Sequence, residues 1–128
     1  MENHHVLLVE DNLDNQNLMK FLLERAGFQV STANNGLEAL DAVRRDPPDI
    51  VLMDLSLPEM DGWTAAKVMK KDPALADIPL IAVTAHTLPG DRRRVLDLGF
   101  DSYISKPINV RMFDVEVTRV LNQKSQAR

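Results

Sequence analysis

A chain of 128 residues, 45% of them hydrophobic, is long enough to bury the core of one domain. Its 15 basic and 19 acidic residues leave a net charge of −4, which provides no electrostatic basis for binding nucleic acid. The sequence has no cysteine, which excludes disulfides and thiol chemistry, and no apolar stretch approaches the roughly 20 residues that span a bilayer. Because the amino terminus also lacks the features of a signal peptide, we expect a cytoplasmic protein with no membrane partner.

Five short apolar runs alternate with five helical patterns, which predicts an α/β fold made of strand–helix units. The most informative run extends from Ile50 to Met53 and ends in Asp54, between proline-containing breakers. Such a run is typical of a strand that is buried on both faces of a parallel sheet. The predicted strands span residues 5–9, 29–33, 49–54, 79–84 and 101–104.

The helix signals between these strands are capping residues, prolines and glycines. The first helix extends from Leu13 to Ala26 and stops at Gly27, the third extends from about Gly62 to Lys71, and Gly99 ends the fourth. The residues expected to cap or begin the second to fifth helices are, in chain order, Asn35 (with Glu38 at capping-box spacing), Asp61, Pro89 and Asn109. The fifth helix is predicted to bury a face made of Val110, Phe113, Val117 and Val120.

Chemically distinctive residues follow four of the predicted strands. Glu10 and Asp11 come after the first, Asp54 ends the third, Thr84 ends the fourth and Lys106 follows the fifth. The carboxyl ends of parallel strands meet at one edge of the sheet, where open α/β sheets bind ligands. Three carboxylates at this edge repel one another unless a cation lies among them. They therefore predict a site for Mg²⁺, or for Mn²⁺, and through the metal for a phosphate.

The turn after the first predicted strand contains no glycine and three acidic residues, Glu10, Asp11 and Asp14. It would repel a bare phosphate, which argues against a flavin or dinucleotide site, and the sequence has no P-loop motif. Asp54 is instead suited to act as a nucleophile that forms an aspartyl phosphate. Taken singly, Asp54 is also compatible with a cap, Thr84 with a strand residue and Lys106 with a solvated side chain. Together with Glu10 and Asp11 they occupy four strand ends, and this joint position favours phosphoryl chemistry.

At these residues the chain resembles the receiver domains of two-component response regulators. The resemblance covers about residues 5–121 and depends on four segments: Val9-Glu10-Asp11, Leu52 to Pro58 with Asp61-Gly62 behind it, Val83-Thr84-Ala85, and Ser105-Lys106-Pro107. It implies a flavodoxin-like doubly wound (βα)₅ fold with a five-stranded parallel sheet in the order 2-1-3-4-5. We accordingly expect a receiver domain over residues 1–121 and a polar, frayed tail over 122–128.

The resemblance also implies a role for each matching residue. Asp54 corresponds to the phospho-accepting aspartate and Asp11 to a direct metal ligand, with Glu10 acting through water. The backbone carbonyl of Ser56 corresponds to a further metal ligand, and Thr84 and Lys106 correspond to the residues that contact the phosphoryl oxygens. Tyr103 corresponds to a switch residue that moves with Thr84, and the small Ala85 leaves room for the Tyr103 ring. The peptide bond before Pro107 is expected to be cis. His86 corresponds either to a residue that controls access of water to the phosphoryl group or to a plain exposed loop residue.

Partners are implied in the same way. The phosphoryl donor would be a phosphohistidine of a sensor histidine kinase or of a histidine phosphotransfer protein, docked against the first helix. A downstream protein would bind the surface of the fourth helix, fifth strand and fifth helix. Arg92, Arg93 and Arg94 belong to that helix, either as a solvated face or as a partner contact. Trp63, the only tryptophan, is expected to be half-buried near the site.

Three functional alternatives remain beside a stand-alone signalling switch that is not an enzyme. The chain has the same chemistry if it is a receiver fragment of a longer hybrid kinase or response regulator. An aspartyl-phosphate phosphatase requires a second aspartate two residues after the nucleophile, and this chain has Ser56 there. A degenerate receiver that binds partners without phosphorylation is disfavoured because Glu10, Asp11, Asp54, Thr84 and Lys106 are all present.

Overall fold

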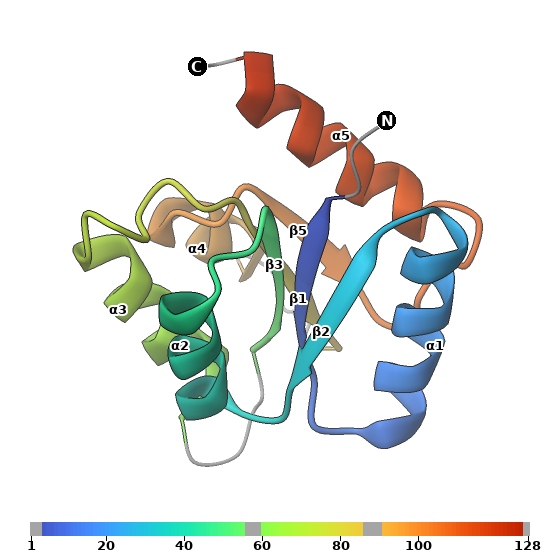
Figure 1. Cartoon of the computed structure of the whole chain (residues 1–128), viewed down its shortest axis with the longest axis horizontal. Coiled ribbons are helices and arrows are strands. Elements are labelled where there is room, and N and C mark those ends of the chain that lie inside the picture. Colours follow the sequence, from blue (N-terminus) through green and yellow to red (C-terminus); the bar gives the residue numbers. More distant parts are fainter. Residues whose placement is uncertain (1–3, 56–59, 86–90, 127–128) are drawn as a thin grey trace.

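The computed structural model of the protein describes residues 4–55, 60–85 and 91–126. Five parallel strands form one sheet in the order β2-β1-β3-β4-β5, which confirms the predicted flavodoxin-like topology. The strands are β1 (His5–Val9), β2 (Gln29–Ala33), β3 (Ile50–Asp54), β4 (Leu80–Thr84) and β5 (Ser102–Ser105). The helices are α1 (Leu13–Arg25), α2 (Gly36–Arg45), α3 (Gly62–Lys71), α4 (Asp91–Leu98) and α5 (Phe113–Gln126). Figure 1 shows α1 and α5 on one side of the sheet and α2, α3 and α4 on the other.

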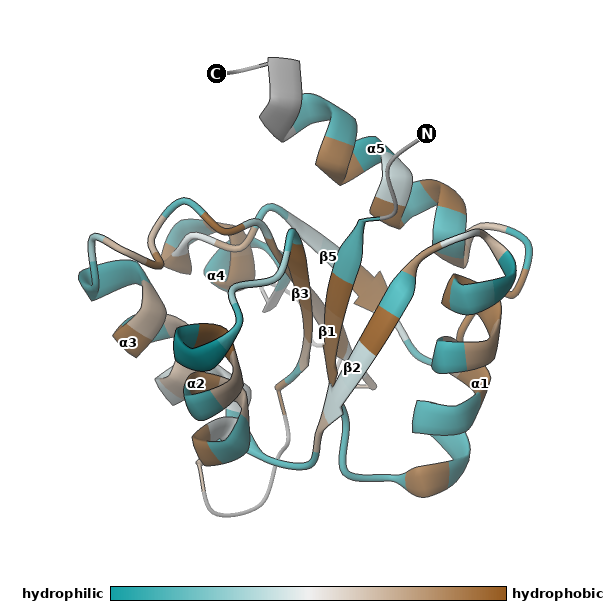
Figure 2. Cartoon of the chain, viewed as in Figure 1, coloured by the Kyte–Doolittle hydropathy of each residue, from teal (hydrophilic) through white to brown (hydrophobic). Residues whose placement is uncertain are grey.

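The central strands are buried on both faces, as the apolar run that ends in Asp54 predicts. Successive side chains of a strand point to opposite faces, so Ile50 and Leu52 pack with residues of α1 and α5. Val51 and Met53 pack with residues of α2, α3 and α4. Figure 2 shows hydrophobic residues along the central strands, between the two helical layers. The sheet is therefore held in place from both sides, and its strand ends form a rigid edge.

The predicted helix caps position the loops at this edge. The Asn35 side chain accepts a hydrogen bond from the Glu38 backbone N–H at 2.8 Å, and Asp61 accepts one from Thr64 at 2.8 Å. The Glu38 carboxylate completes the cap of α2 by accepting from the backbone N–H of Asn34, at 3.1 Å. Both caps confirm the sequence prediction. They start α2 three residues after the end of β2, and α3 in contact with the end of β3 through the Gly62 backbone N–H, which donates to the Leu55 carbonyl at 3.3 Å.

The carboxyl-terminal helix differs from its prediction at both ends. Asn109 caps a turn, not the helix itself, because its side chain accepts from the Arg111 backbone N–H and α5 begins only at Phe113. Val110 therefore lies outside the helix and is 47% exposed, so it does not belong to the buried face. The helix continues to Gln126, so residues 122–126, which the sequence assigns to a polar tail, are helical. None of the helices in the described ranges combines the length and hydrophobicity that crossing a bilayer requires.

Candidate functional site

The register of the sheet aligns the strand ends that carry the predicted site. Val9 pairs with Met53, Asp54 with Val83, and Thr84 with Ser105. The residues that end or follow these strands therefore lie at one edge, the lower edge of the sheet in Figure 1. The backbone N–H of Lys106 donates to the Thr84 carbonyl at 2.9 Å, which extends the pairing one residue beyond β5.

Lys106 joins two of the predicted carboxylates. Its Nζ lies 2.6 Å from Glu10 Oε1 and 2.8 Å from Asp54 Oδ2, so one ammonium forms an ion pair with each. Hydrogen bonds between charged groups at these distances are among the strongest that side chains make. The bridge connects β1, β3 and β5 and shows that three segments far apart in sequence meet at this site.

The two carboxylates of this bridge are buried. Glu10 has no exposed surface and Asp54 is 5% exposed. Burial raises the pKa of the Glu10 carboxyl above its ordinary value, because a charge is costly away from water. Hydrogen bonds from Lys106 and from the Asn12 backbone N–H oppose this rise, and the negative charge of Asp54 adds to it. The site therefore concentrates negative charge where water does not screen it.

Burial and the neighbouring carboxylates act on the pKa of Lys106 in opposite directions. Partial burial by itself lowers the pKa of the Lys106 ammonium, but the hydrogen bonds to Asp54 and Glu10 outweigh this and leave the pKa raised. The side chain stays protonated and is 16% exposed. A fixed positive charge is thus held beside Asp54, where a phosphoryl oxygen on that residue would need one.

Glu10, Asp11 and Asp54 form a cluster that fits a divalent cation. One carboxylate oxygen from each lies within 4.8 Å of the others. Asp11 is exposed while the other two are buried, so a bound ion would reach water on one side and protein on the other. Mg²⁺ is bound in this way, by one or two carboxylates together with waters and a phosphate oxygen. The oxygen-only set and its negative charge therefore suit Mg²⁺ or Mn²⁺.

Two residues that support the site were not identified as such from the sequence. Gln16 Nε2 donates to the Glu10 carbonyl at 2.9 Å and to Asn34 Oδ1 at 3.2 Å, so it ties α1 to the loop after β2. Gly62 lies so close to β3 that an added Cβ would be 2.3 Å from the Asp54 carbonyl oxygen. Gly62 was part of the family resemblance, whereas nothing in the sequence distinguished Gln16.

The structure also places most of the other predicted site residues. Thr84 is buried at the end of β4, and Ala85 beside it is exposed. Tyr103 is half-buried in β5, against the core on the side of α2, α3 and α4. The bond between Lys106 and Pro107 is cis, as expected. Ser56 and His86 lie outside the described residues.

Comparison with known proteins agrees with this geometry. The family model of the response regulator receiver domain matches residues 6–117. The chain is 46% identical over 108 residues to the polar-differentiation response regulator DivK of Brucella anthropi, covering 84% of this chain and 88% of that protein.

Solved receiver structures are similar over nearly the whole chain. The receiver domain of the sensor histidine kinase PA1611 from Pseudomonas aeruginosa, which has a magnesium ion in its active-site cleft, is 31% identical with a TM-score of 0.86. The alignment covers 94% of this chain and 99% of that one. A response regulator structure from Chloroflexus aurantiacus has a TM-score of 0.90 at 26% identity, with coverage of 94% and 99%. The chain belongs to the response regulator receiver domains, the phosphorylation-dependent switches of two-component signalling.

Proposed function

We propose that Asp54 is the phosphoryl acceptor of this receiver and that Lys106, Thr84 and a Mg²⁺ ion assist the transfer. The observation that carries the proposal is the double ion pair of Lys106 with Asp54 and Glu10, at 2.8 and 2.6 Å. It brings the acceptor, a fixed cation and a candidate metal ligand together at one strand edge. No other group of at least three acidic or histidine side chains in the described ranges has this spacing.

In the proposed transfer, a carboxylate oxygen of Asp54 attacks the phosphorus of a phosphohistidine. The new O–P bond forms as the P–N bond breaks, and the electron pair of that bond returns to the histidine nitrogen. Lys106 is already in hydrogen-bond contact with the acceptor, so it would need little movement to contact a phosphoryl oxygen. Thr84, buried at the end of the neighbouring strand, would donate its hydroxyl to another oxygen.

A metal ion would be held by Asp11 and Asp54 directly and by Glu10 through water. The Glu10 oxygens already accept hydrogen bonds from Lys106 and from the Asn12 backbone N–H, whereas the exposed Asp11 faces solvent. The Ser56 carbonyl remains a further proposed ligand. When bound, Mg²⁺ supplies positive charge to the phosphoryl oxygens as the transfer proceeds.

The output of the switch would be a change of protein contacts. Phosphorylation adds about two negative charges, and Tyr103, half-buried in β5, is proposed to turn inward as Thr84 moves toward the phosphoryl group. This would alter the surface of α4, β5 and α5 for a downstream protein. The donor would be a histidine kinase or a phosphotransfer protein that docks against α1. Ala85, His86 and Pro107 would flank the site.

Two arrangements of this function remain open. One is a single-domain regulator, which the similarity to DivK over 88% of that protein supports. The same chemistry would serve a receiver within a longer kinase, for which the similarity to the PA1611 receiver is support. In both, the protein would assist only its own phosphorylation and dephosphorylation and would have no separate substrate.

Phosphorylation by a small donor tests the acceptor. With acetyl phosphate and Mg²⁺, we expect the protein to gain one acid-labile phosphoryl group, detected by intact-protein mass spectrometry. Asp54→Asn should abolish the gain because the amide is not a nucleophile. The matched control is Asp41→Asn on the exposed surface of α2, which should be labelled like the native protein. Full labelling of Asp54→Asn would assign the acceptor to another residue.

A further inference from the structure

Every polar group of the buried Glu10 has a hydrogen-bond partner. Its backbone N–H donates to the Ala33 carbonyl at 3.0 Å, and its two carboxylate oxygens accept from Lys106 at 2.6 Å and from the Asn12 backbone N–H at 3.1 Å. The Glu10 carbonyl accepts from the Gln16 side-chain Nε2 at 2.9 Å. Glu10 is thus fixed from β2, from the segment after β5 and from the start of α1.

The hydrogen bonds around Gln16 leave its amide one orientation. Glu38 Oε1 accepts from the Asn34 backbone N–H at 3.1 Å and from Asn34 Nδ2 at 3.3 Å. Because a carboxylate only accepts hydrogen bonds, the Asn34 amide must turn its nitrogen to Glu38 and its oxygen to Gln16. Gln16 Nε2 donates to that oxygen at 3.2 Å and to the Glu10 carbonyl at 2.9 Å, and both of these oxygens only accept. The Gln16 side chain is therefore held by both N–H groups of its amide.

The hydrogen bonds of Gln16 lead, through Asn34, to the first turn of α2. Glu38 belongs to this turn, and the Asn35 side chain caps it. The Gly36 backbone N–H donates to the Met60 carbonyl at 2.9 Å, which fixes the turn to the segment that precedes α3. Gln16 is thus supported by a helix end that is itself held in place.

The Glu10 carbonyl belongs to the peptide group that leads into Asp11. A peptide group is planar, so its carbonyl oxygen and the Cα of the next residue keep a fixed relation. The hydrogen bond from Gln16 to this oxygen therefore fixes the place from which the Asp11 side chain reaches the site. Because Asp11 is exposed, the position of its carboxylate depends strongly on this peptide group.

The rigidity of a carboxylate site influences which divalent cation it prefers. Mg²⁺ requires near-ideal octahedral geometry with ligand oxygens at about 2.0–2.1 Å, whereas Ca²⁺ accepts about six to eight oxygens at about 2.3–2.6 Å in flexible arrangements. A site whose ligands become mobile therefore loses more affinity for Mg²⁺ than for Ca²⁺. A group that fixes Asp11 should change the ratio of the two affinities.

We propose that Gln16 is a positioning residue that gives the site its preference for Mg²⁺ over Ca²⁺. This role rests on the metal site of the proposed function, in which Asp11 and Asp54 are the direct ligands. Gln16 would act through the Glu10 carbonyl and not by contact with the ion. Groups that hold metal ligands in place by hydrogen bonds typically contribute about 10- to 100-fold to metal affinity.

Gln16→Met tests the proposal, because the thioether keeps the length of the side chain but cannot donate a hydrogen bond. In isothermal titration calorimetry, we expect Mg²⁺ to bind this variant about tenfold more weakly than the native protein, and Ca²⁺ less than about threefold more weakly. Asn34→Ala should cause a smaller change in the same direction. It should add little to Gln16→Met, since both residues act through one chain of hydrogen bonds.

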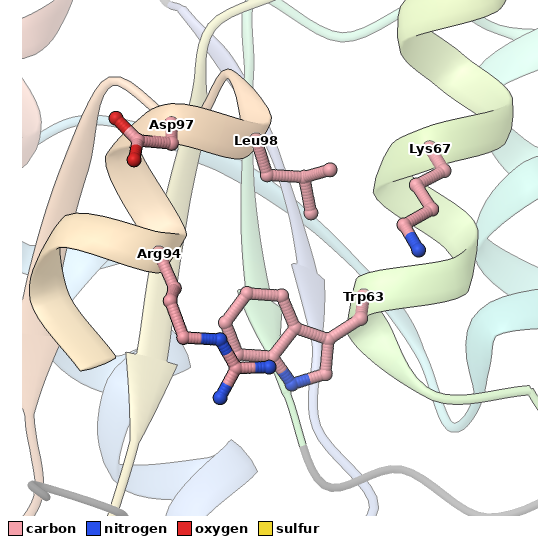
Figure 3. Close-up of a pocket in the computed structure, with 5 residues that line it drawn as sticks. All are labelled: Trp63, Lys67, Arg94, Asp97 and Leu98. Carbon is pink, nitrogen blue, oxygen red and sulfur yellow. The ribbon is translucent and has the colours of Figure 1, made fainter. Parts of the chain in front are cut away.

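Trp63 is a less direct probe of the metal site than calorimetry. The Arg94 guanidinium lies over the indole, 5.0 Å from its centroid, as Figure 3 shows. A movement of α4 would therefore change the fluorescence of Trp63 without any change in metal affinity. The heat of binding does not depend on this contact alone, and it compares the two cations in the same way.

Gln29→Met is the matched control, since it makes the same substitution at an exposed glutamine at the amino end of β2, away from the site. It should leave both affinities within about twofold of native. Equal losses for Mg²⁺ and Ca²⁺ in Gln16→Met, or a lower stability to urea in EDTA with both affinities native, would overturn the positioning role, even where Asp11→Asn abolishes Mg²⁺ binding. Native Mg²⁺ affinity in Asp11→Asn would instead overturn the metal site itself, and the role of Gln16 with it.

Discussion

At the scale of single residues, burial separates side chains of the same type into different roles. Glu10 and Asp11 are neighbours in the sequence, yet the first is fully buried against Lys106 and the second is exposed. A buried carboxylate needs a cation because desolvation penalises its charge. Glu10 thus holds Lys106 in position, and the exposed Asp11 is the carboxylate proposed to contact a metal ion directly. Lys106 also pairs with Asp54, so the electrostatic balance of the site depends on this one ammonium.

Lys106→Ala should lower the free energy of unfolding by about 2–3 kcal/mol in the presence of EDTA, because it leaves two buried carboxylates without their counter-ion. Urea denaturation measures this. Mg²⁺ should still bind and should restore part of the loss, whereas phosphorylation should no longer change the affinity for a partner. The exposed Lys71→Ala is the control and should change stability by less than about 0.5 kcal/mol. A Lys106→Ala protein whose partner affinity still responds to phosphorylation would refute the coupling role.

The contribution of the Glu116 carboxylate to folding stability should depend on pH. Hydrogen bonds from Arg119, at 2.8 and 2.6 Å, lower the pKa of the Glu116 carboxyl, and Ser102 also donates to it. A carboxyl with a lowered pKa stabilises the fold above its unfolded pKa of about 4.5, and this stabilisation is lost as the pH falls through the folded value.

Glu116→Gln should therefore cost about 0.5–1 kcal/mol at neutral pH, since the pair is partly exposed. The difference from the native protein should shrink as the pH falls below 4.5, the ordinary pKa of the group. Thermal unfolding across this range measures it, with the exposed Glu24→Gln as the control. A difference that stays constant into acid would show that the lost hydrogen-bond geometry, and not the charge, is responsible.

At the scale of elements, the close approach of α3 to β3 determines where the proposed acceptor, Asp54, lies. The helix begins at Gly62, whose backbone N–H donates to the Leu55 carbonyl at 3.3 Å, so its first turn lies directly on the end of β3. An added Cβ would be 2.3 Å from the Asp54 carbonyl oxygen and 2.9 Å from the Leu55 Cα. These are backbone atoms, which cannot rotate away as a side chain can. Any larger residue must therefore displace either α3 or the end of β3.

Gly62→Ala should reduce stability by about 1–3 kcal/mol, as overpacking does, and should also slow phosphorylation of Asp54 by acetyl phosphate. The control is Gly27→Ala, at a φ of +100° with no atom near its Cβ, far from the site. That variant should lose about 1 kcal/mol through backbone strain while its labelling rate is unchanged. Normal labelling of Gly62→Ala would show that α3 absorbs the displacement and that Asp54 stays in place.

At the scale of the whole molecule, the sheet order assembles the site. With β1 and β3 adjacent and β4 and β5 beyond them, the residues at their carboxyl ends form one continuous edge. Two hydrophobic layers, one with α1 and α5 and the other with α2, α3 and α4, keep this edge rigid. The packing of the whole fold thus holds Glu10, Asp11 and Asp54 together against their electrostatic repulsion. A bound cation should reduce this repulsion and so stabilise the folded protein.

Mg²⁺ should raise the thermal unfolding midpoint, because a ligand of the folded state adds about 2.7 kcal/mol of stability at one hundred times its dissociation constant. Trp63 fluorescence should respond in the same titration, since α3 begins beside Asp54. Asp11→Asn should remove both effects, whereas Asp14→Asn, in the first turn of α1, should keep them. An equal midpoint shift with potassium chloride of the same ionic strength would attribute the stabilisation to screening, not to a site.

The sequence by itself determined the alternation of strands and helices, the caps at Asn35 and Asp61, and the kinds of chemical groups at the strand ends. These features depend on residues a few positions apart, through side-chain periodicity and local hydrogen bonds. The late start of α5 at Phe113 escaped prediction because Asn109 also caps a turn.

Only the tertiary structure decided how these local parts meet. Lys106 and Glu10 are 96 residues apart, and their ion pair exists because five strands align at one edge. The contact of Arg94 with Trp63 likewise depends on how α4 packs beside α3, which no local pattern specifies. Contacts of this kind follow from the burial of two hydrophobic layers, a property of the whole chain.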